Sequence, residues 1–182
     1  MRKYILLVAL SFLISCQNQQ SVQEYLVAKQ NDPAFKTLSL TPNLLTSTFD
    51  KLTEDEIATL KKVKSVNLAF LVNDAESEKF SDESKILERI MQQKKYKSLM
   101  RINANDKKMN LLYIGDPEAI DELLFYGNSK DIGLLLARIN SHDLEPNDVM
   151  KIVKMAKDFD LDQLEDFIGT VQSQVKAKKK KE

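Results

Sequence analysis

The apolar residues of the chain follow three patterns: one unbroken run near the start, stretches that alternate with polar residues, and stretches with helical spacing. Alternation predicts strands, and spacing of three and four residues predicts amphipathic helices. After Val22 these patterns predict a strand, a helix, a strand, a helix, four strands and two helices. We therefore expect an α+β fold with a mixed, largely antiparallel sheet of about five to six strands that packs against helices.

The first half of this region is predicted to contain two strands and two helices. The strands cover Lys36–Thr41 and Ser65–Val72, which are rich in alternating apolar residues. A capping box at Thr53–Glu56 starts a helix that includes Val63. Ser81 is predicted to cap the second helix, because two acidic residues follow it. The apolar face of that helix contains Ile86, Leu87, Ile90 and Met91.

The second half is predicted to begin with four short strands and to end in two helices. The third strand is ambiguous, because Asp116–Glu118 is also a good helix start. The apolar run Leu123–Tyr126, directly before a predicted turn at Gly127–Ser129, favours the strand. The four strands are Ser98–Ala104, Met109–Ile114, Ile120–Tyr126 and Ile132–Ile139, and the two helices are Asn147–Lys157 and Leu161–Val171.

The unbroken apolar run, from Tyr4 to Ile14, follows the basic residues Arg2 and Lys3. A helix needs about 20 apolar residues to cross the hydrocarbon core of a membrane. A signal peptide needs only about 7–15 after a charged start. The run therefore indicates a cleaved export signal and not a permanent span.

The end of this run resembles the lipobox of bacterial lipoproteins. Leu13 stands three residues before Cys16, and the small Ser15 stands directly before it. The resemblance implies attachment of diacylglycerol to Cys16 and cleavage between Ser15 and Cys16, usually followed by N-acylation. The resulting organisation is a signal peptide over 1–15, a lipidated cysteine with a polar tether over 16–21, one α+β domain over 22–172 and a Lys-rich tail over 173–182.

Charge and cysteine content narrow the classes of partner. The chain has 27 basic and 27 acidic residues. The tail, Lys176–Glu182, is basic, and the body that remains without the tail and the signal peptide is acidic. An acidic body argues against nucleic-acid binding, which needs a clustered basic surface. Cys16 is the only cysteine, so no intramolecular disulfide is expected, and neither a metal site nor a cofactor is predicted.

Few residues offer catalytic chemistry. His142 is the only histidine and hence the one classical general base, and we interpret it as a turn residue before a helix. Asp158–Asp162 resembles the start of a calcium loop but lacks its later glycine and glutamate. A carboxylate cluster near the third strand is interpreted as a solvated edge, and no catalytic residue is assigned. The cluster consists of Asp116, Glu118, Asp121 and Glu122.

Several hydrophobic segments resemble a bacterial family that is catalogued only as a domain of unknown function, number 4252. These segments are Lys64–Leu68, Tyr96–Arg101, Met109–Tyr113, Ile120–Phe125, Leu134–Ile139 and Asp143-Leu144. The resemblance implies an exported, often lipid-anchored domain. It implies no activity and no catalytic residues.

Together these features lead us to expect a lipid-anchored protein of the cell envelope that binds a protein or another envelope component through its α+β domain and is not an enzyme. The anchor would place it on the cell membrane or outer membrane. The residues Gln17–Gln20 lack the acidic signal that some surface-exported lipoproteins use, which favours an orientation towards the periplasm. A carboxylate-based hydrolase or metal-dependent enzyme, and a small-ligand carrier, remain alternatives.

Overall fold

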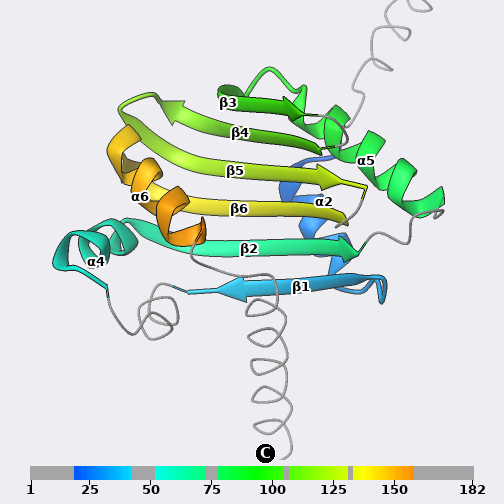
Figure 1. Cartoon of the computed structure of the whole chain (residues 1–182), viewed down its shortest axis with the longest axis horizontal. Helices are drawn as coiled ribbons and strands as arrows, with labels where there is room; N and C mark the ends of the chain where they lie inside the picture. The colour runs from blue at the N-terminus through cyan, green and yellow to red at the C-terminus, as the bar shows by residue number, and fades with distance from the viewer. Residues whose placement is uncertain (1–18, 42–51, 73–77, 105–106, 131–132, 158–182) are drawn as a thin grey trace, which may run out of the picture.

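The computed structural model describes residues 19–41, 52–72, 78–104, 107–130 and 133–157. Its centre is a six-stranded sheet with the order β1-β2-β6-β5-β4-β3, in which every neighbouring pair is antiparallel (Figure 1). The last four strands along the chain form a continuous meander, and β6 then pairs with β2. The strands are β1 (Phe35–Leu40), β2 (Val63–Val72), β3 (Lys97–Ala104), β4 (Lys107–Asp116), β5 (Ala119–Ser129) and β6 (Gly133–Leu144).

Helices cover both faces of the sheet. α2 (Val22–Lys29) and α5 (Glu78–Met91) pack on one face, which we call the α2/α5 face. α6 (Pro146–Lys157) packs on the other, the α6 face, and in Figure 1 it crosses in front of the strands. α4 (Glu54–Lys61) contacts both α6 and β2. Among the described residues, no helix is long and apolar enough to cross a membrane.

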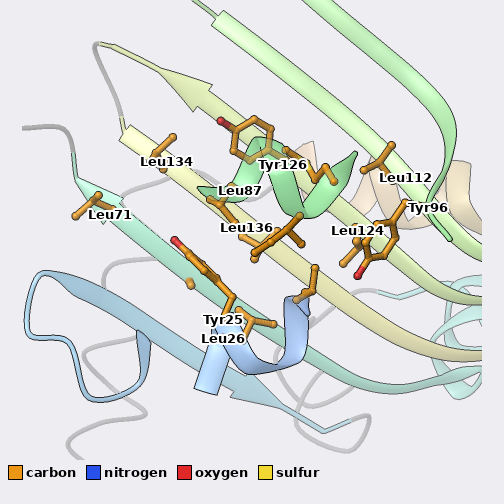
Figure 2. Close-up of a cluster of buried hydrophobic side chains, with 14 of the residues drawn as sticks. Tyr25, Leu26, Leu71, Leu87, Tyr96, Leu112, Leu124, Tyr126, Leu134 and Leu136 are labelled. Carbon is orange, nitrogen blue, oxygen red and sulfur yellow. The ribbon is translucent and has the colours of Figure 1, made fainter. Parts of the chain in front are cut away.

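The main core lies between the sheet and the two helices of the α2/α5 face (Figure 2). Successive side chains of a strand point to opposite faces, so alternate residues of β4, β5 and β6 supply this layer. Leu124 and Tyr126 of β5 and Leu136 of β6 are at most 1% exposed. Tyr25 of α2 is fully buried above them, and its hydroxyl donates to Glu83 of α5 at 2.9 Å. The core therefore joins both helices to the central strands.

The α6 face has two smaller apolar clusters. One joins Val149 of α6 to buried residues of the meander, including Leu111 and Leu123. The other lies on the same face but near the β1–β2 edge of the sheet, and it contains Leu38 of β1 and Val63 of β2. Ile139 and Ile152 pack against both clusters, so α6 bridges the meander and the β1–β2 hairpin.

Local sequence signals explain where two helices begin. Ser21 accepts from the Glu24 amide, and the Glu24 carboxylate accepts from the Ser21 amide. Thr53 and Glu56 form the same reciprocal pair at α4. Each pair satisfies amide groups that the first helical turn leaves without partners.

A buried carboxylate joins α4 to α6. Asp148 accepts hydrogen bonds from Thr59 Oγ1 at 3.0 Å, Lys62 Nζ at 2.6 Å and the Glu145 amide at 3.1 Å. Burial opposes ionisation, but these hydrogen bonds outweigh it and lower the pKa of Asp148 below its ordinary value of 3.8. A carboxyl group with a depressed folded-state pKa stabilises the fold above its unfolded-state pKa and loses that contribution as the pH falls.

We expect Asp148→Asn to lower the free energy of unfolding by about 1–3 kcal/mol at pH 7, because buried donors lose a charged acceptor. The loss should shrink as the pH falls below the unfolded-state pKa of about 3.8 and towards the lower folded-state pKa, where the wild-type carboxylate becomes protonated. Urea unfolding at several pH values measures both effects. The matched control is Asp55→Asn, which removes an exposed carboxylate that also spans α4 and α6, to Lys151. Equal losses in the two variants would contradict the assigned role of Asp148.

The expected fold class is confirmed, with six strands and a fully antiparallel sheet. The third strand of the meander is a strand and not the alternative helix. The capping box at Thr53–Glu56 and the helix predicted over Asn147–Lys157 are also confirmed.

Four local predictions are wrong. α5 begins at Glu78, so Ser81 lies inside the helix and does not cap it. α4 ends at Lys61, and Val63 starts β2. Gly127–Ser129 is not a turn but the end of β5, because it pairs with β6 through Ser129 and Gly133. His142 is not in a turn before a helix, because β6 continues to Leu144. The short helix α2 was not predicted.

Candidate functional site

The predicted lipidation and cleavage residues, Ser15 and Cys16, lie outside the described residues. The same holds for Asp158–Asp162 and for the last predicted helix. His142 is exposed on β6, where its backbone amide donates to the Lys62 carbonyl at 2.9 Å. In the part of the chain that the structure describes, no group of three or more His, Cys, Asp or Glu side chains is arranged to hold a metal ion.

The four carboxylates near the third meander strand do not lie together as one cluster. Asp116, Glu118 and Asp121 are exposed at the connection between β4 and β5. Glu122 is 9% exposed and lies on the α2/α5 face, where it forms an ion pair with Arg138. The interpretation of all four as a solvated edge is therefore wrong for Glu122, and β5 is an inner strand of the sheet.

The Glu122–Arg138 pair joins three elements. Arg138 Nη2 donates to Glu122 Oε2 at 2.5 Å across β5 and β6, and Arg138 Nη1 donates to Gln23 of α2. Arg138 Nε is buried and has no hydrogen-bond partner among the described residues. Since both charged groups are paired and largely buried, we interpret them as a structural connection between α2 and the sheet.

Tyr96 lies close to this ion pair, directly before β3. Burial raises the pKa of Tyr96 to about 12, and the negative charge of Glu122 acts in the same direction. The phenol therefore remains protonated at neutral pH and does not serve as a general base there.

The most accessible backbone of the sheet is β3. It is the last strand in the sheet order, and all eight of its residues are exposed (Figure 1). The other edge strand, β1, buries Phe35, Leu38 and Leu40. An edge strand presents unpaired amide and carbonyl groups, which are a template for pairing with another chain.

The side chains of β3 add apolar surface to this open backbone. Leu99, Met100 and Ile102 are 39%, 37% and 41% exposed, and they account for three of the five exposed large apolar residues in the described chain. Large apolar side chains on an accessible edge are typical of an interaction surface. The exposed edge of β3, Lys97–Ala104, is therefore the candidate interaction site.

The sequence of β3 contains a signal for this site that is not a catalytic motif. A half-buried strand alternates strictly between apolar and polar residues. In β3 the adjacent Leu99 and Met100 break the alternation, and the register with β4 shifts between Ser98 and Met100. Apolar residues that do not fit one buried face indicate a strand that is not fully covered.

Of three comparisons with known proteins, one gives a match. No curated protein and no solved structure shows a significant match to the chain. The family model described as "Domain of unknown function (DUF4252)" matches residues 25–152. The match runs from α2 into α6 and includes all six strands. The chain therefore belongs to the DUF4252 family.

Proposed function

We propose that this protein is a lipid-anchored binding module of the cell envelope that performs no chemical reaction. Two parts of the chain support the proposal. The basic start, the short apolar run and the Leu13–Cys16 segment supply an anchor. The α+β domain offers an open edge at β3, with three exposed large apolar side chains.

The exposure of β3 is the observation that carries the binding function. The positions of the carboxylates favour no hydrolase, because Glu122 is paired with Arg138 and the other three are exposed away from it. An anchored domain with an accessible edge strand can hold a partner at the membrane surface without any catalytic group. Main-chain hydrogen bonds then supply affinity, and side chains beside the edge supply specificity.

Cross-linking in the intact envelope tests the binding function. A lysine-reactive cross-linker should give a reproducible adduct with a second envelope protein, identified by mass spectrometry. The control is a variant in which the tail lysines are changed to glutamine, since clustered lysines react with the cross-linker without specificity. We expect the adduct to persist in the control. A chain that stays strictly monomeric under all cross-linking conditions would contradict a binding function.

A further inference from the structure

From the charge and apolar pattern of β3 we infer that this edge binds an extended, acidic protein segment, which adds to the sheet as a seventh strand. The inference rests on the proposed binding function and specifies its surface and its type of partner. The segment would alternate apolar and acidic side chains.

The two sides of β3 differ in chemistry. Directly paired residues of an antiparallel sheet lie on the same face. Met100 pairs with Leu111, which packs with α6, so Met100 and Ile102 extend the apolar α6 face to the edge of the sheet. Arg101 pairs with Asn110 and lies on the opposite face. A partner strand with period two would therefore place apolar side chains beside Met100 and Ile102, and acidic side chains beside Arg101.

The charged side chains of β3 itself are all positive. Lys97 and Arg101 are the only charged residues of β3. Lys94 and Lys95 precede the strand, and Lys107 starts its neighbour β4. Arg101 is exposed and makes no ion pair with any described residue. Electrostatic complementarity selects partners by opposite charge, so the edge favours an acidic segment.

The same charges argue against a second copy of this chain as the partner. Antiparallel pairing of two β3 strands would bring their cations together without any acidic residue of β3 to compensate. Like charges across a strand pair are destabilising. The register shift at Leu99 also limits regular pairing to the end of the strand, from Met100 to Ala104. A short segment of opposite charge satisfies both constraints.

Peptide binding to the full chain, purified in detergent, tests the inference. The probe is a fluorescent octapeptide of alternating valine and glutamate, compared with one of alternating valine and lysine. Fluorescence anisotropy should show about tenfold tighter binding of the acidic peptide, since the cross-strand charge pair at Arg101 changes from attractive to repulsive and the nearby lysines add to the preference. Methylation of the peptide amides on one strand edge should abolish binding, because strand addition needs those hydrogen bonds.

Charge reversal on β3 provides the decisive comparison. Arg101→Glu should reverse the preference or reduce it to equal binding. The matched control is Lys61→Glu, which makes the same charge change at an exposed position of α4. It should retain the preference of the wild type. An unchanged preference in Arg101→Glu, binding that survives amide methylation, or a dimer of the chain that Arg101→Glu strengthens would each overturn the inference.

These outcomes separate the inference from the proposed function. If envelope cross-links persist while the peptides show no preference, the β3 site is wrong and the binding function stands. If the peptides bind as expected but the chain is not retained at the membrane, the anchor is wrong and the site stands.

Discussion

Replacing Cys16 by alanine is expected to release the protein from membranes and to abolish its labelling by fatty acid. Each buried methylene contributes about 0.8 kcal/mol, and a single myristoyl-sized chain gives only marginal binding. The diacylglycerol that the Leu13–Cys16 segment implies exceeds that limit. Loss of the lipid should therefore shift the protein into the soluble fraction.

Metabolic labelling followed by fractionation measures both parts of this expectation. Ser15→Ala is the matched control, because it keeps a small residue before the cysteine and should retain label and membrane association. A Cys16→Ala variant that stays in the membrane fraction or keeps the label would contradict lipidation at Cys16.

The largest loss of stability is expected from Leu124→Ala. Leu124 is fully buried on the inner strand β5, beneath the helices of the α2/α5 face (Figure 2). It lies directly opposite Leu112 of β4. Truncation removes apolar contacts and leaves a cavity in a layer that helices cover, so we expect a loss of about 2–5 kcal/mol in the free energy of unfolding.

Urea unfolding followed by circular dichroism measures this loss. Leu99→Ala is the control, because it removes the same atoms from a side chain that is 39% exposed on β3. Its effect should be within about 0.5 kcal/mol, as for most surface substitutions. Comparable losses in both variants would contradict the assignment of the core to the α2/α5 face.

The inner strands of the meander were predictable because their sequences contain the apolar residues that the sheet buries. The apolar run Leu123–Tyr126 of β5 outweighed the helix start at Asp116–Glu118. The reciprocal side chains of Thr53 and Glu56 likewise fixed the start of α4 locally. Where one short segment contains all the partners that decide a structure, sequence patterns predict it.

The errors arose where distant contacts decide the local structure. Gly127–Ser129 has turn composition, but Asn128 Nδ2 donates to Ser84 Oγ of α5 at 2.7 Å and keeps this segment in the strand. Ser81 resembles a helix cap, but Phe80 packs against the main core and lies within α5. Tertiary contacts of this kind override local propensity.

The candidate site was only partly predictable for the same reason. Which strand forms an edge depends on the strand order, and β6 reaches β2 across a long separation in the sequence. Before that order was known, the irregular apolar pattern of β3 had no evident meaning. The buried pair of Glu122 and Arg138 also depends on the register of β5 and β6, which placed Glu122 inside the fold.

Lipid attachment at Cys16 is the central claim, and the mass of the mature N-terminus tests it most directly. The protein is extracted from membranes with detergent, digested, and its N-terminal peptide is measured by mass spectrometry. We expect a peptide that begins at Cys16 and carries diacylglycerol, with a further acyl chain where N-acylation occurs. A chain that begins at Met1, or one with an unmodified Cys16, would contradict it.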